Sequence, residues 1–329
     1  MTRPVQFRAR FALAAGFTGP EDEYDHGDVH VQIVPNTGAS GSTLYCSITD
    51  TPRPVVLEAL RAIYRGEAPV GSYLADQLPG FARAVIEDVT SEWASYFTSV
   101  SSRLGEFAKR FVDMHQWVSH IEVPSQMSER ETAFLLDDGE WLAVGSKGMA
   151  SISIRTAATP LRSSERSTLD ALLSSGLRRP IGHELLEDAR SLPIQAKMVM
   201  IMAAIEVGTK EFLAAASPAT SWLVRNIPSP PIDNILRKAI PEPREGINST
   251  DLSAFHVPVH LVHKIKHGVE QRNATIHRGI QVDPMSFIDE LEDAASELLY
   301  LLDRFRGHVW AEAYLSPETL SDLKTLKQN

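Results

Sequence analysis

The chain has 329 residues, enough for two domains of ordinary size, and its 43% hydrophobic and 22% charged residues are typical of a globular protein. A net charge of −10 argues against a protein coated with nucleic acid, and no apolar run approaches the ~20 residues of a membrane span. The single cysteine, Cys46, excludes a disulfide within the chain and a zinc site built from cysteines. The charged start, Met1–Arg8, lacks the apolar segment of a signal peptide, so we expect a cytoplasmic protein that does not contact a membrane.

The first part of the chain, residues 1–165, is predicted to be an α+β domain. Alternating apolar residues indicate strands at Val5–Phe11, Val29–Ile33 and Leu44–Ile48. Cys46 belongs to the last of these patterns, which predicts a buried, unreactive side chain. Large apolar residues at helical spacing follow over 53–117, and strands return over 132–155, where Asp138-Gly139 is typical of a hairpin turn.

The second part is predicted to be an all-α domain over residues 180–315, followed by a C-terminal tail over 316–329. Ser, Thr, Arg and Pro are frequent in residues 156–180, which places the domain boundary there. The last long helix is predicted over Pro284–Tyr314, because Asp283 can cap it and proline is favoured at the first helical position.

A carboxylate lies inside an otherwise apolar helical face that runs from Leu185 to Phe212 and is interrupted by Pro193. This residue is Glu206, and an unpaired buried carboxylate is energetically costly. We therefore expect Glu206 to pair with a cation from another helix, and Arg272 is the obvious candidate.

The most informative stretch is residues 270–279, which read E-Q-R-N-A-T-I-H-R-G and contain the pattern R-N-x-x-x-H-x-G. Arg272, Asn273 and His277 carry this pattern, and a long helical region lies on either side of it. The stretch resembles the signature of HEPN domains (higher eukaryotes and prokaryotes nucleotide-binding), and with its flanks it is similar to the Apea-like HEPN proteins over roughly residues 181–315. One position departs from a subfamily that is paired with nucleotidyltransferases, because Gly279 stands where that subfamily has tyrosine.

The resemblance implies a metal-independent endoribonuclease of HEPN type that needs no cofactor and works as a homodimer through its C-terminal domain. It also implies a bacterial defence or toxin system that is kept silent until triggered, with an antitoxin or other regulator as a further partner. The N-terminal domain would then act as a sensor or regulator.

The residue types of the motif suit this chemistry on physical grounds. RNA can be cut by its own 2′-hydroxyl, so the protein must move protons and stabilise negative charge on the phosphate. Histidine both accepts and donates protons near neutral pH, which makes His277 the candidate acid and base. Arginine offers a permanent charge and a forked donor set, which makes Arg272 the candidate phosphate ligand, with Asn273 orienting His277 or binding phosphate.

Helix geometry complicates a site within one copy. Arg272 and His277 are five residues apart, so on a regular helix their side chains diverge by roughly 140°. Both can reach one phosphate only if the helix distorts or ends between them, or if Arg272 serves a neighbouring copy of the chain.

The same predicted helix carries a cationic cluster and a row of histidines. Candidate RNA-binding residues are Lys264, Lys266, His267 and Arg278, which leave a local excess of positive charge with Glu270 as the only acid nearby. The histidine row consists of His256, His260, His263 and His267, on the side of the helix opposite its apolar residues. This row could face a dimer partner or RNA, lie in solvent, or bind a metal.

Two other functions therefore stay open beside RNA cleavage. One is a HEPN module that binds nucleotides or RNA, or serves as a scaffold, without catalysis. The other is a metal-dependent hydrolase that uses the histidine row.

Overall fold

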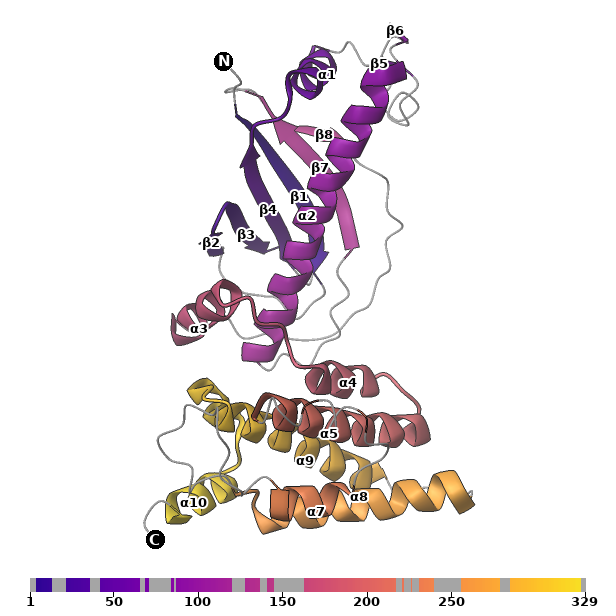
Figure 1. Cartoon of the computed structure of the whole chain (residues 1–329), viewed down its shortest axis with the longest axis vertical. Helices are drawn as coiled ribbons and strands as arrows, with labels where there is room; N and C mark the ends of the chain where they lie inside the picture. The colour runs from indigo at the N-terminus through magenta and orange to yellow at the C-terminus, as the bar shows by residue number, and fades with distance from the viewer. Residues whose placement is uncertain are drawn as a thin grey trace. The chain divides into compact units, whose positions relative to one another are not determined.

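The chain divides into two compact units, residues 1–177 and 178–329 (Figure 1). The computed structural model describes residues 4–13, 22–35, 42–65, 69–70, 84–85, 87–119, 128–136, 141–144, 163–216, 221, 226, 231–239, 256–278 and 285–326. The first unit contains an antiparallel sheet with helices, and the second is mostly helical. The coarse prediction of an α+β part followed by a helical part is therefore confirmed.

A six-stranded antiparallel sheet forms the centre of unit 1, in the order β2-β3-β4-β1-β7-β8. Its strands are β1 (Val5–Leu13), β2 (Asp22–His26), β3 (Val29–Pro35), β4 (Ser42–Asp50), β7 (Ser128–Leu135) and β8 (Leu142–Val144). Two short strands, β5 (Pro69–Val70) and β6 (Ala84–Val85), pair in parallel as a separate sheet. The hairpin predicted around Asp138-Gly139 has its two strands in β7 and β8, while the turn itself and the strand expected up to residue 155 lie outside the described residues.

Strand alternation fixes which side of this sheet faces the core. In β1 every second residue from Val5 to Leu13 is buried, and the register pairs Ala9 with Cys46 of β4. Cys46 is fully buried, and burial raises the pKa of its thiol to about 12, so it stays a neutral thiol as predicted. The turn between β2 and β3 contains Gly27 at φ +61°, a conformation that favours glycine.

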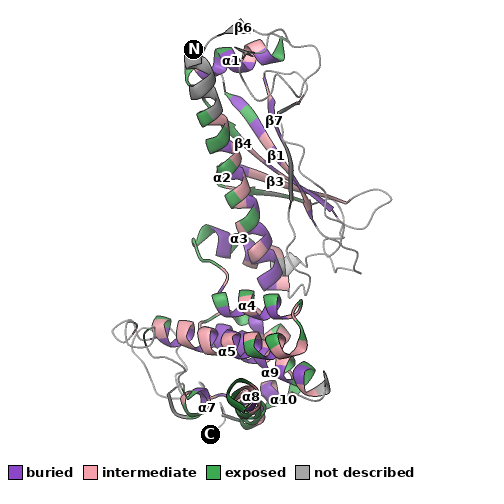
Figure 2. Cartoon of the chain, turned by 90° about the vertical axis from the view of Figure 1, so that its right-hand side faces the viewer, coloured by how far each residue is buried: buried purple, intermediate pink, exposed green. Residues whose placement is uncertain are grey.

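Three helices complete unit 1: α1 (Pro54–Tyr64), α2 (Glu87–Ser119) and α3 (Ser163–Ser174). The long helix α2 packs on β1 and β4, and both α1 and α3 pack on α2. Leu104, Ala108 and Phe111 of α2 are fully buried, while exposed residues follow the side of α2 turned away from the sheet (Figure 2). The hydroxyl of Tyr96 donates a 2.8 Å hydrogen bond to Asp50 at the end of β4.

Within its described residues, unit 2 is a helical bundle. The helices that pack together at its centre are α4 (Ile181–Ala189), α5 (Ile194–Ala216), α8 (Val259–Arg278) and α9 (Met285–Phe305). The remaining elements are α7 (Ile232–Asn234), the π-helical turn η2 (Ile235–Ala239), the 3-10 helix η4 (Val309–Tyr314) and α10 (Pro317–Leu326). Helix α5 lies in the middle of this bundle, because it packs on α4, α8 and α9.

The last long helix is shorter than the sequence predicts. The prediction of one helix over Pro284–Tyr314 is wrong, because α9 ends at Phe305 and η4 follows as a separate element. Gly307 has φ +97°, and the amides of Gly307 and His308 donate to the carbonyls of Arg304 and Asp303, each at 3.1 Å. This is a Schellman motif, which ends a helix at a glycine in the left-handed conformation. The cap and first residue expected at Asp283 and Pro284 lie outside the described residues.

Glycines let the helices of unit 2 approach one another closely. A Cβ atom added to Gly182 of α4 would lie 2.8 Å from the Cα atom of Gly208 in α5. A Cβ added to Gly268 of α8 would lie 2.6 Å from Leu291 of α9. Side chains at these positions would push the helices apart, so the glycines help to set the distances at which α5 and α8 carry their functional side chains.

Among the described helices, none is both long enough and apolar enough to cross a membrane.

Candidate functional site

Helix α8 carries the R-N-x-x-x-H motif in its last two turns. The helix begins directly after Pro258, whose carbonyl accepts a 3.2 Å hydrogen bond from the amide of Val262. Leu261 and Ile265 in its first half are fully buried against the bundle. The helix stays regular through His277 and ends at Arg278, so the motif is presented on a continuous helical turn.

Arg272 pairs with Glu206 across the bundle, as the sequence predicts. The guanidinium Nη1 lies 2.7 Å from the carboxylate Oε1, which joins α8 to α5. The two side chains are mostly shielded from solvent, with 18% and 17% of their surfaces exposed. A pair of opposite charges at this distance and burial is a strong contact, and losing one partner leaves the other partly buried without compensation.

The Arg272 guanidinium is only partly satisfied by this contact. Its Nε atom is buried and has no hydrogen-bond partner among the described residues. Most buried polar atoms in folded proteins do have a partner, so the contact with Glu206 leaves the hydrogen-bonding capacity of Arg272 partly unused.

His277 and Asn273 lie on the solvent side of α8. Both residues are exposed, whereas Arg272 is turned toward α5. Because α8 is helical throughout, Arg272 and His277 leave it roughly 140° apart. One copy of the chain therefore does not direct these two side chains at the same phosphate.

The predicted RNA-binding cations are at the surface. Lys264, Lys266 and Arg278 are exposed, and Lys266 lies 3.9 Å from Glu270 on the next turn. His267 is exposed as well, but its ring contacts the ring of Phe287 at 4.6 Å between centroids, and its Nε2 lies 3.1 Å from the Gln271 amide nitrogen. These side chains therefore lie along α8, with Lys264, Lys266 and His267 before the motif and Arg278 directly after it.

The histidine row is divided among different partners. His260 lies 3.4 Å from both Glu318 and Thr319 of α10, while His263 is exposed and His267 contacts Phe287. His256 precedes the first turn of α8. Across the described part of the chain, no three His, Cys, Asp or Glu side chains are grouped as metal ligands would be.

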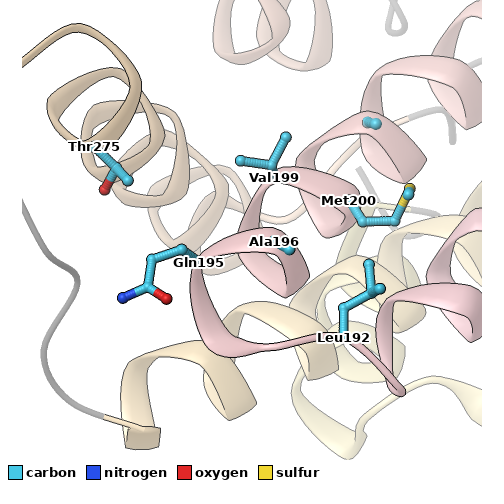
Figure 3. A pocket seen from close by; sticks show the side chains of 7 residues that line it. Leu192, Gln195, Ala196, Val199, Met200 and Thr275 are labelled. Carbon is cyan, nitrogen blue, oxygen red and sulfur yellow. The ribbon is translucent and has the colours of Figure 1, made fainter. Parts of the chain in front are cut away.

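An open apolar hollow of about 490 Å³ lies between α5 and the end of α8 (Figure 3). We name it the α5–α8 hollow, and it is lined by Leu192, Gln195, Ala196, Val199, Met200, Ala203 and Thr275. Figure 3 shows the labelled side chains of the α5 region on one side and Thr275 of α8 on the other. Thr275 is three residues after Arg272, so the hollow opens beside the motif.

One lining residue of this hollow, and one residue next to its lining in the sequence, are large apolar side chains that are exposed. Val199 lines the hollow and is 38% exposed, and Ile276 follows Thr275 and is 54% exposed. Ile276 continues the apolar side of α8 that includes the buried residues Leu261 and Ile265. The sequence shows that apolar residues continue along this side of α8 as far as Ile276. It does not show that Ile276 is left exposed, unlike the buried residues earlier on the same side.

Sequence reasoning also missed an ion pair network that fixes α5. Glu292 of α9 lies 2.7 Å from Arg190 and 2.5 Å from Lys197, at the end of α4 and the start of α5. Burial raises the pKa of Glu292, but the hydrogen bonds from Lys197 and Arg190 outweigh this effect and lower the pKa below its usual value. This contact holds the helix that carries Glu206.

No protein-family model, no curated protein and no solved structure matches this chain.

Proposed function

We propose that unit 2 is a HEPN-type endoribonuclease that cuts RNA without a metal ion or other cofactor. The observation that carries the proposal is the position of the motif. Arg272 is held by Glu206 from another helix, His277 is exposed on the next turns of the same helix, and cationic side chains lie around both. Arginine and histidine are the residue types that phosphate binding and proton transfer need.

The proposed reaction uses the RNA as its own nucleophile. The 2′-oxygen attacks the neighbouring phosphorus as its proton leaves, and the bond from phosphorus to the 5′-oxygen breaks as that oxygen gains a proton. The products are a 2′,3′-cyclic phosphate and a free 5′-hydroxyl. His277 supplies the proton transfer, Arg272 stabilises the charge on the phosphate, and Asn273 binds phosphate or orients His277. Lys264, Lys266, His267 and Arg278 bind the flanking RNA.

A homodimer through unit 2 follows from the divergence of Arg272 and His277. A two-fold axis would bring equivalent residues of two copies to one cleft, so that each copy completes the site of the other. The α5–α8 hollow is an apolar depression and Ile276 is an exposed apolar side chain, so in the proposed dimer Ile276 of one copy enters the hollow of the other. The occupant we propose for this hollow is a second copy of the chain.

Unit 1 is proposed to regulate this activity in a bacterial defence or toxin system of the cytoplasm, together with an antitoxin or other regulatory partner. This assignment rests on the resemblance of the motif region to HEPN proteins.

A non-catalytic HEPN module that binds RNA is the second candidate. The observation that favours it is the divergence of Arg272 and His277 on α8, because one copy of the chain does not direct both side chains at the same phosphate. Binding without cleavage would support this function.

The purified full chain should cleave single-stranded RNA in EDTA, and it should leave DNA of the same sequence intact because DNA lacks the 2′-hydroxyl. His277→Ala should lower the rate by roughly 10²–10⁴-fold, the typical value of one proton-transfer group. His263→Ala is the matched comparison, since it removes an exposed histidine from the same helix. Cleavage of DNA, or a need for a divalent ion that His263→Ala also affects, would contradict the proposed chemistry and favour the metal-dependent hydrolase.

A further inference from the structure

The contact between Arg272 and Glu206 cancels the charge that an RNA phosphate would need. The Glu206 carboxylate is 2.7 Å from the guanidinium, and neither side chain is more than 18% exposed. A carboxylate and a phosphodiester each carry one negative charge, and both accept hydrogen bonds from the guanidinium donors. The two anions would therefore compete for one cation.

We propose that this ion pair is a closed state of the site, in which the Glu206 carboxylate takes the place of an RNA phosphate. Opening the site means that Arg272 leaves Glu206 and turns its fork toward the phosphate. The inference deepens the proposed function and rests on it for the identity of the anion, while the competition itself is a matter of binding and requires no cleavage.

The buried Nε atom of Arg272 makes the closed state less favourable than a fully satisfied contact would be. In the closed state Arg272 binds Glu206 through Nη1, and Nε has no partner among the described residues. An arginine that turns outward can donate from Nε and one Nη together to two phosphate oxygens, which is a stronger arrangement than one bond. The unsatisfied nitrogen raises the free energy of the closed state and so brings the two states closer.

The opposite role for Glu206 predicts an opposite result. If Glu206 held Arg272 in the orientation that phosphate needs, removal of its charge would weaken RNA binding. If Glu206 competes with phosphate, removal of its charge strengthens RNA binding. The sign of the change in affinity therefore decides between competition and positioning.

The test measures binding of a short fluorescein-labelled 2′-O-methyl RNA, which cannot be cut, to the full chain by fluorescence anisotropy at fixed salt. Glu206→Gln keeps the size of the side chain and removes its charge. We expect at least about fivefold tighter binding, the upper end of what exposed ion pairs contribute, because this pair is mostly buried. The matched control is Glu270→Gln on α8, the helix that carries Arg272, because it removes the negative charge of a side chain that is 61% exposed and forms no ion pair with Arg272 among the described residues.

Two further variants make the result specific to this pair. The gain from Glu206→Gln should disappear when Arg272→Gln is present as well, since no guanidinium is then released. Glu206→Asp retracts the carboxylate by one methylene and should tighten binding by a smaller factor, so the proposal stays testable should the glutamine variant not fold. A gain no larger than that of Glu270→Gln, or one that persists without Arg272, would overturn the proposal.

The result of this binding test is independent of whether the chain cleaves RNA. If Glu206→Gln binds the probe more tightly but the chain never cuts RNA, the closed state is supported and the ribonuclease proposal is wrong. If the chain cuts RNA but Glu206→Gln does not bind the probe more tightly, the ribonuclease is supported and the closed-state proposal is wrong.

Discussion

The crossing of α4 and α5 is set by a glycine that a single methyl group should disturb. In Gly182→Ala the new Cβ would lie 2.8 Å from the Gly208 Cα atom and 3.1 Å from the Ala204 carbonyl oxygen. Both neighbours are backbone atoms, so they cannot move aside without shifting a helix. The third neighbour, a methyl carbon of Leu299, would be 3.0 Å away in a buried side chain.

The expected cost combines overpacking with a gain in helix propensity. Inserting a methyl group into a packed core costs about 1–3 kcal/mol. Alanine is favoured over glycine inside a helix by up to about 1 kcal/mol. Because the 2.8 Å neighbour is a backbone atom, we take the upper end of the overpacking cost, and subtracting the propensity gain leaves a loss of about 2 kcal/mol in the free energy of unfolding. For a unit of this size, that is a fall in melting temperature of roughly 4–8 °C.

Thermal unfolding of the full chain by far-UV circular dichroism measures this effect, with Gly105→Ala as its control. Gly105 lies inside α2, and a Cβ added there would meet nothing within 4 Å. This variant should keep or raise stability, because only the propensity gain remains. The reasoning fails if Gly182→Ala unfolds at the parent temperature, or if Gly105→Ala is the less stable of the two.

Two other variants test the surface beside the motif and the network that holds α5. If unit 2 dimerises as proposed, Ile276→Asp should raise the dissociation constant of that dimer at least about tenfold, because burying an unpaired carboxylate costs more than 1.4 kcal/mol. Light scattering after size exclusion should therefore give a monomer, whereas Val259→Asp, at an apolar residue that is 58% exposed on the same helix, should leave the dimer intact. Glu292→Gln should lower the free energy of unfolding by about 2 kcal/mol at neutral pH, and less at low pH. The folded-state pKa of Glu292 is lowered, so its stabilisation is complete above its usual pKa and is lost as the pH falls through the lowered value. An equal difference at both pH values in urea unfolding would show that the charge of Glu292 is not what stabilises the fold.

Local pattern was enough to predict those features that depend on a residue and its close neighbours. The alternation around Cys46 predicts a buried strand residue, and the structure has it fully buried in β4. The Glu206–Arg272 contact joins residues far apart in sequence, but a carboxylate inside an apolar face has few possible partners, so its partner could be named. The first prediction rests on the alternation of a strand, and the second on the cost of burying an unpaired carboxylate.

Features that depend on the meeting of distant segments could not be predicted in this way. Nothing near Gly182 indicates that another glycine will oppose it from α5, and nothing near Glu292 indicates two cations from α4 and α5. The end of α9 was missed because an apolar pattern continues beyond Phe305, while the left-handed conformation of Gly307 ends the helix. The α5–α8 hollow forms where the side chains of α5 and α8 no longer pack against each other. Its position is set by the lengths of these helices and by the angle at which they cross.

The first turn of α4 is completed by residues of its own unit. The Glu211 carboxylate accepts hydrogen bonds from the amides of Ile181 and Gly182 at 3.0 and 3.1 Å, and Arg179 binds Glu187. Since the amides of a helix start need partners outside the helix, these contacts supply them from α5 of the same bundle. A replacement of the segment before Arg178 therefore leaves both partners of these hydrogen bonds and of this ion pair in the chain.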